Sequence, residues 1–101
     1  MDDLVRFEAT FIGDVVYWRG PSPFHFVPVP PAEASEIRAI APLVTYGWGV
    51  IPVRARIGAS TFTTSLFPRN GSYLVPVKDA VRRAEGIATG DTVTLELEIG
   101  G

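Results

Sequence analysis

The sequence contains no cysteine and a single histidine, His25, among its 101 residues. The absence of cysteine excludes disulfide bonds, thiolate nucleophiles and every cysteine-based metal site. A zinc site would have to combine His25 with carboxylates, which is a poor match to the ligand sets that zinc usually takes. We therefore predict no bound metal and no cofactor.

Long hydrophobic runs are also lacking, because no stretch of eighteen apolar residues occurs in the chain. A membrane-spanning helix needs such a stretch. The first six residues, Met-Asp-Asp-Leu-Val-Arg, are acidic and have no apolar segment of the kind found in secretory signal peptides. We expect a cytoplasmic protein with no signal peptide and no membrane partner.

The residues that are present suit one domain with a hydrophobic core. Hydrophobic residues make up 47% of the chain and charged residues 20%, a balance that disordered sequences do not have. A length of 101 residues corresponds to one ordinary domain. We predict a single β-barrel domain over residues 1–101.

Alternating apolar and polar residues indicate mostly β structure. Residues 4–12 alternate with a period of two, and similar patterns predict strands at 15–18, 24–29, 48–57, 61–67, 73–77 and 92–99. Residues 32–41 and 78–85 have helical composition. Pro31 suits the first helical position, and we expect Pro42 to end the first helix and Gly86 to end the second. The fold class predicted is all-β, a small closed β-barrel with two short helices.

A short motif occurs twice in the chain. Phe-Val-Pro-Val at 26–29 and Leu-Val-Pro-Val at 74–77 lie 48 residues apart, each followed by a predicted helix, a glycine-containing turn and a long strand. This order predicts an internal duplication, in which two halves close one barrel around a pseudo-two-fold axis. Both halves lie in one chain, so we predict a monomer. The alternative is a chance recurrence in a sequence that contains nine prolines.

Two family resemblances agree with this architecture. Residues 74–97 combine a strand with proline, a helix with Arg82-Arg83, then Gly86-Ile87 and Gly90-Asp91, a pattern similar to one arm of the AbrB-like swapped-hairpin transcription factors. The chain more closely resembles a bacterial family catalogued as domain of unknown function 1905. The motifs that carry this resemblance are Tyr-Gly-Trp-Gly-Val-Ile-Pro-Val at 46–53, Ile-Gly at 57–58, Thr-Ser-Leu-Phe-Pro at 64–68 and Gly-Ser-Tyr-Leu-Val-Pro-Val at 71–77, with Arg82-Arg83 and Gly90-Asp91. This resemblance implies a closed double-split β-barrel, and it supplies no established activity, cofactor or catalytic residue.

The charges are unevenly distributed along the chain. Residues 52–83 carry six cationic side chains against Asp79 alone, a net charge of +5, although the whole chain has a net charge of −2. A basic face of this kind predicts binding to DNA or RNA, with phosphate contacts from Arg54, Arg56, Arg69, Lys78, Arg82 and Arg83. Aromatic residues are candidates to stack on single-stranded bases: Tyr46, Trp48, Phe62, Phe67 and Tyr73. The alternative is that the charges pair locally, with Arg54 and Arg56 against Glu96 and Glu98, and that the aromatic residues belong to the core.

A second hypothesis is a module that binds a small anionic ligand or a protein partner. Tyr17, Trp18, Tyr46 and Trp48 border loops with glycine or proline, where aromatic side chains often line a pocket. Such a pocket would use Tyr46, Trp48 and Arg54, whose guanidinium suits an anionic group.

Enzymatic motifs are missing. No Gly-x-Ser-x-Gly elbow, Gly-x-Gly-x-x-Gly loop or Walker sequence occurs, and nothing in the pattern brings Ser65, His25 and a carboxylate together. We therefore predict a non-enzymatic binding protein with no catalytic residues.

Overall fold

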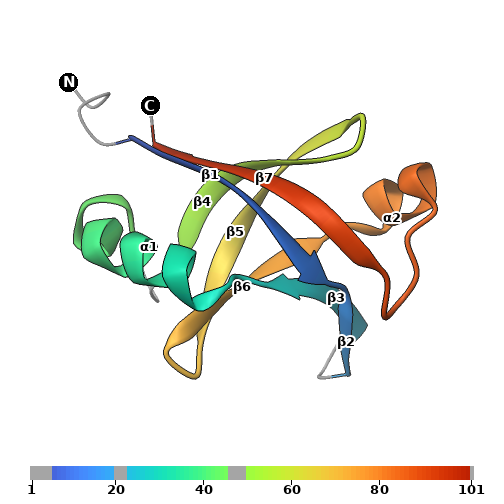
Figure 1. Cartoon of the computed structure of the whole chain (residues 1–101), viewed down its shortest axis with the longest axis horizontal. Coiled ribbons are helices and arrows are strands. Elements are labelled where there is room, and N and C mark those ends of the chain that lie inside the picture. Colours follow the sequence, from blue (N-terminus) through green and yellow to red (C-terminus); the bar gives the residue numbers. More distant parts are fainter. Residues whose placement is uncertain (1–5, 20–22, 46–49, 101) are drawn as a thin grey trace.

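The computed structural model describes residues 6–19, 23–45 and 50–100 (Figure 1). Within these residues the chain forms seven strands and two helices: β1 (Arg6–Asp14), β2 (Val16–Arg19), β3 (Pro23–Pro28), α1 (Pro31–Val44), β4 (Ile51–Ile57), β5 (Ser60–Arg69), β6 (Ser72–Val77), α2 (Asp79–Glu85) and β7 (Thr92–Gly100). Every predicted strand and both predicted helices are present. Positions 4, 5, 48 and 49 of the predicted strands lie outside the described residues.

The strands form one antiparallel sheet in the order β1-β7-β4-β5-β6-β3-β2. The sheet curls around its core into an open half-barrel (Figure 1). The strand β5 belongs to both halves, because residues 60–66 pair with β4 and residues 67–69 pair with β6. The mostly-β prediction is confirmed, but the prediction of a closed barrel is wrong.

The sheet stays open where β1 approaches β3. A Cβ atom built on Gly13 would lie 2.6 Å from Cγ1 of Val27 and 3.4 Å from the carbonyl oxygen of Pro28, so the two strands are in close contact there. No ladder joins β1 to β3 in the described ranges. Proline has no N–H to donate to a ladder, and after Val15 the chain continues directly into β2, which pairs with β3 instead. Closure was predicted from the number of strands and from the sequence repeat, neither of which specifies this contact.

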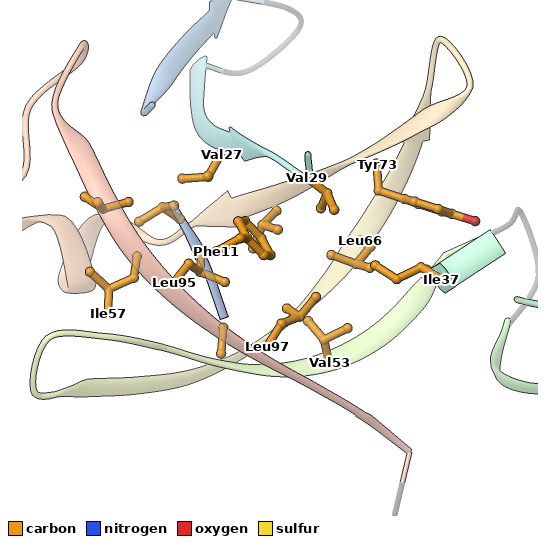
Figure 2. Close-up of a cluster of buried hydrophobic side chains, with 14 of the residues drawn as sticks. Phe11, Val27, Val29, Ile37, Val53, Ile57, Leu66, Tyr73, Leu95 and Leu97 are labelled. Carbon is orange, nitrogen blue, oxygen red and sulfur yellow. The ribbon is translucent and has the colours of Figure 1, made fainter. Parts of the chain in front are cut away.

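The core lies on the concave side of the sheet, as Figure 2 shows. Alternate side chains of each strand point to this side of the sheet. In β4 every second residue from Ile51 to Ile57 is buried, and β7 buries four residues from Val93 to Ile99 in the same way. Phe11, Leu66 and Leu95 meet at its centre (Figure 2). Ile37 of α1 is fully buried against them, so the first helix closes one end of the core.

The first helix is longer than expected. Pro31 stands at its first positions as predicted, but Pro42 lies inside the helix, which continues to Val44. Pro42 removes only one backbone donor, and the last turn is closed by Thr45, whose N–H and hydroxyl both donate to the carbonyl of Ala41. The second helix ends at Gly86 as predicted, in a left-handed conformation with φ 65° and ψ 38°. No helix of the described residues is long and apolar enough to cross a membrane.

The two Val-Pro-Val segments lie side by side in the sheet. Val27 of β3 stands directly opposite Val75 of β6, and Phe26 stands opposite Pro76. The long strands that follow the two helices, β4 and β7, also pair with each other, with Ala55 opposite Leu97. Segments related by the sequence repeat are therefore neighbours.

Candidate functional site

The outer face of strands β1, β7 and β4 carries a ladder of charged side chains. Arg54 and Arg56 project from the same face of β4, as predicted from their spacing. Arg54 Nε donates to Oε1 of Glu98 at 3.1 Å, and Arg56 Nη2 donates to Oε2 of Glu96 at 2.7 Å. Local pairing, the alternative considered from the sequence, is therefore what these two arginines do.

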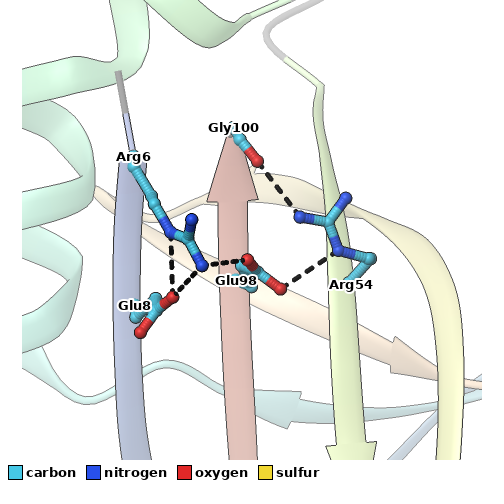
Figure 3. A network of polar contacts seen from close by, with 5 residues as sticks. All are labelled: Arg6, Glu8, Arg54, Glu98 and Gly100. Carbon is cyan, nitrogen blue, oxygen red and sulfur yellow. Dashed lines mark hydrogen bonds and ion pairs between the residues drawn. The ribbon is translucent and has the colours of Figure 1, made fainter. Parts of the chain in front are cut away.

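The ladder continues across to β1 (Figure 3). Arg6 Nη2 lies 2.6 Å from a carboxylate oxygen of Glu8 and 2.9 Å from Oε2 of Glu98. Glu98 thus joins two arginines, and the hydrogen bond from Arg54 holds the pKa of the Glu98 carboxyl below its usual range. We name this surface the charge ladder: Arg6, Glu8, Arg54, Arg56, Glu96 and Glu98. Three cations face three anions, so the surface is neutral and does not present free positive charge.

A hollow of about 780 Å³ lies on this side of the sheet. Its polar lining includes Glu8, Thr10, Arg54, Arg56, Thr61 and Thr63. Arg54, one of the three residues predicted to line a ligand pocket, lies in this hollow. Tyr46 and Trp48, the other two residues predicted to line that pocket, lie outside the described residues.

The remaining predicted phosphate contacts lie elsewhere. Arg82 of α2 pairs with Asp79 at 2.9 Å, and its side chain is only 22% exposed. Its Nε is buried without a hydrogen-bond partner in the described part of the chain. The expectation that both helical arginines lie on an open face therefore holds for Arg83 only. Lys78 and Arg83 are exposed and form no ion pair with another described residue.

A cluster of aromatic rings covers the outer face of the other half of the sheet. Phe26 of β3 is fully buried, yet it lies outside the main core, because its neighbour Val27 points into the core and alternate residues point to opposite faces. Three partly exposed rings surround it: Trp18 at 6.0 Å, Phe24 at 5.9 Å and Phe67 at 6.1 Å between ring centroids. We call these four residues the aromatic face. The exposed fractions of Trp18, Phe24 and Phe67 are 43%, 49% and 39%.

Arg69 lies on the aromatic face, and Lys78 directly follows the adjoining strand β6. The guanidinium carbon of Arg69 lies 4.3 Å from the centre of the Trp18 ring, a cation–π contact. Lys78 follows the buried Val77 in an extended conformation, with φ −67° and ψ 149°, so it points outward like Pro76. The last ladder pair of β3 and β6 is His25 with Val77, and Lys78 follows directly after this pair, before α2 begins.

Sequence reasoning found this site only in part. It named Phe67, Arg69 and Lys78, but it assigned stacking roles also to Phe62 and Tyr73, which pack against or within the core. It placed Trp18 at a pocket mouth and did not single out Phe24 or Phe26. The available signal was the alternation of Phe24 and Phe26 along one strand, with Trp18 on the strand before it.

These observations define a class of domain: a mostly-β protein whose seven-stranded antiparallel sheet curls into an open half-barrel with two helices. Residues 11–97 match the protein family described as "Domain of unknown function (DUF1905)". The chain therefore belongs to that family, and the closer of the two resemblances read from the sequence is confirmed. No curated protein matches the chain. Nothing in these comparisons supports the relation to AbrB-like proteins.

Proposed function

We propose that this domain is a non-enzymatic protein that binds nucleic acid through the aromatic face. The observation that carries the proposal is the gathering of three exposed rings around buried Phe26, with Arg69 over Trp18 and the exposed Lys78 directly after β6. Exposed aromatic clusters of this kind mark interaction sites, because leaving them in water is unfavourable. Cations beside aromatic rings suit a polymer that offers both phosphates and flat bases.

Ion pairs already engage three of the six arginine and lysine residues predicted to contact phosphate. Arg54 and Arg56 are engaged by Glu98 and Glu96, and Arg82 is engaged by Asp79. A phosphate would have to displace a carboxylate from each of these arginines. The proposed phosphate contacts are therefore Arg69 and Lys78, with Arg83 on the adjoining helix as a further candidate.

Few phosphate contacts imply weak, moderately salt-sensitive binding. For single strands the logarithm of affinity falls with the logarithm of salt by about 0.7 per phosphate contact, so two contacts give a slope of about −1.4. Affinity would then fall only about sevenfold between 50 and 200 mM salt. The net charge of −2 is consistent with binding in which electrostatic attraction to phosphates contributes only a modest part of the affinity.

The test is fluorescence anisotropy of labelled oligonucleotides at low salt. Two double variants remove the same charge: Arg69→Gln with Lys78→Gln on the aromatic face, and Arg54→Gln with Arg56→Gln on the charge ladder. We expect the first pair to weaken binding at least fivefold and the second to leave it within a factor of two. Equal losses in both, or no binding by the unaltered protein, would overturn the proposal.

A small anionic ligand in the hollow is the second candidate. The hollow of about 780 Å³ and the presence of Arg54 and Arg56 in its lining favour it. Against it, Arg54 already donates to Glu98 and to the carbonyl of Gly100. Thermal unfolding with added citrate or phosphate tests it, because a ligand held by Arg54 would raise the melting temperature of the unaltered protein but not of Arg54→Gln.

We also propose that the two halves of the sheet arose by duplication. A local two-fold axis in an antiparallel pair relates the residues that face each other, and Val27 faces Val75, its equivalent 48 residues later. Ala55 faces Leu97, 42 residues later, so β4 and β7, the strands that follow the two helices, also face each other. The proposal predicts that β5 and β6 superpose on β1 and β3 after a rotation of about 180°, in an experimental structure. Failure to superpose would overturn it.

A further inference from the structure

We infer that the ligand of the aromatic face is a single strand whose unpaired bases stack on Trp18, Phe24 and Phe67. This inference rests on the proposed function and names the form of nucleic acid that the site takes. Its starting point is geometry: the three exposed rings each lie about 6 Å from Phe26, so they surround one centre instead of being scattered.

Phe26 holds the exposed rings in place. It is fully buried beneath them, and the planes of Trp18, Phe24 and Phe67 are inclined to it by 48°, 51° and 55°. Rings packed on a common buried partner have already lost much of their side-chain freedom. Binding to a pre-ordered surface costs less entropy than binding that must order side chains first.

A double helix fits this surface poorly. Its bases are stacked on one another and paired, so their flat faces are not available to protein rings. A duplex would meet the aromatic face with phosphates and sugars alone, while the surface offers Arg69 and Lys78 as its cations. Unpaired bases, in contrast, bring a flat face to each ring whatever their sequence.

The position of Arg69 indicates how the first base binds. Its guanidinium lies over the Trp18 ring, 4.3 Å from the centroid, where a base would stack. A planar guanidinium stacks on aromatic rings and also forms paired hydrogen bonds with phosphate. On binding, a base takes the ring of Trp18 and Arg69 moves to a neighbouring phosphate, so both groups keep a partner.

A second copy of this chain is a less suitable occupant. Two copies related by a two-fold axis would bring the same surface patch of each into contact. The aromatic face carries Arg69 over Trp18, so such a contact would place a cation of one copy near that of the other. Phosphates of a nucleic acid strand complement this charge instead.

The decisive experiment compares three probes of one length: a ten-nucleotide oligo(dT), a ten-base-pair duplex, and an abasic strand that keeps the phosphates but lacks bases. We expect the single strand to bind at least tenfold more tightly than either of the others. Equal binding of all three would overturn the inference. If the double variant Arg69→Gln with Lys78→Gln still weakened the binding of all three probes equally, the proposed function would hold and only the inference of a single strand would fail.

Substitution of each exposed ring tests whether a base stacks on it. Stacking on an aromatic residue contributes about five- to a hundredfold in affinity per base, so Trp18→Leu, Phe24→Leu and Phe67→Leu should each weaken oligo(dT) binding within that range. Leucine keeps Phe26 covered while removing the ring. The matched control is Tyr17→Leu, because Tyr17 is also 43% exposed but lies on the opposite face of β2. Equal effects at Tyr17 and Trp18 would overturn the inference.

Tryptophan fluorescence gives an independent readout. The chain has two tryptophans, Trp18 and Trp48, so Trp48→Phe leaves Trp18 as the sole reporter. Oligo(dT) should quench this signal and the abasic strand should not. If no probe binds and sedimentation shows a dimer abolished by Phe24→Leu, both the inference and the proposed function are wrong, and the aromatic face joins two copies.

Discussion

The carboxylate of Glu85 lies directly against Gly58, in the space that a side chain at position 58 would occupy. Gly58 has φ +59°, in the left-handed region, at the turn between β4 and β5. Ser60, just beyond the turn, donates from Oγ to Oε2 of Glu85 at 2.6 Å. This contact ties the β4–β5 turn to α2, two parts of the chain that the sequence separates by 25 residues.

Gly58→Ala should destabilise the domain more than Gly71→Ala. Both glycines have positive φ, but a Cβ at Gly71 would meet no atom within 4 Å, so Gly71→Ala costs only the backbone strain of about 1–2 kcal/mol. Gly58→Ala has this strain too, and in addition it forces the carboxylate of Glu85 to move. Urea unfolding measures the difference, which should vanish in a Glu85→Ala background. Equal losses in the unaltered background would contradict the contact.

Phe26 should stabilise the fold as strongly as a residue of the main core. Phe26→Ala should lower the free energy of unfolding by about 3–5 kcal/mol, the usual range for a buried phenylalanine. Phe24→Ala, at a ring 49% exposed, should cost clearly less. Chemical denaturation measures both, and Phe26→Leu serves if the alanine variant is unfolded. Similar losses at positions 24 and 26 would show that Phe26 is not the buried support of the aromatic face.

His25 should titrate below its ordinary pKa of about 6.5. Burial lowers the His25 pKa first, and the positive charge of Arg82 lowers it further, while Asp79 opposes the shift. The fold disfavours the protonated ring, so this contribution to stability is complete above the ordinary pKa and is lost as the pH falls through the folded-state pKa.

Because His25 is the chain's one histidine, its ring proton signals in NMR are assigned without ambiguity. We expect Arg82→Gln to raise the midpoint and Asp79→Asn to lower it. A midpoint above 6.5 in the unaltered protein would be inconsistent with these contacts.

Glu98 should contribute more to stability at neutral pH than Glu96. Glu98 accepts from Arg54 and Arg6, whereas Glu96 accepts from Arg56. The lowered Glu98 pKa means that its stabilising effect is present above the ordinary carboxyl range and is lost as the pH falls through the folded-state value. Thermal unfolding at pH 7 should therefore show a larger loss for Glu98→Gln than for Glu96→Gln, with the gap shrinking at high salt. A gap that is unaffected by salt would speak against the charge ladder.

The strands and their inward faces followed from local pattern. The period of two in residues 92–99 correctly predicted that Val93, Leu95, Leu97 and Ile99 point to the core. Pro42 shows where a local rule was overridden, because Ile37 and its neighbours anchor the helix and one lost backbone hydrogen bond does not end it. Closure was predicted wrongly, since it depends on whether β1 and β3 form a ladder, which is a contact between distant strand edges.

The candidate site depended almost entirely on contacts between distant residues. Arg54 and Glu98 are 44 residues apart. Counting charges along the chain therefore left open whether Arg54 and Arg56 are paired, and the structure shows that they are. Phe26 and Phe67 come from β3 and β5, which α1 and β4 separate in the chain, yet their rings lie 6.1 Å apart.

The sequence by itself determined the β-rich class, the two helices, the family and the inward side of the regularly alternating strand β7, because these depend on side-chain period, turn residues and short motifs. Only the tertiary structure decided which cations keep their charge free for a partner and which aromatic rings remain at the surface. The physical reason is that ion pairing and burial are properties of neighbours in space, and curling the sheet sets those neighbours through strand order and register.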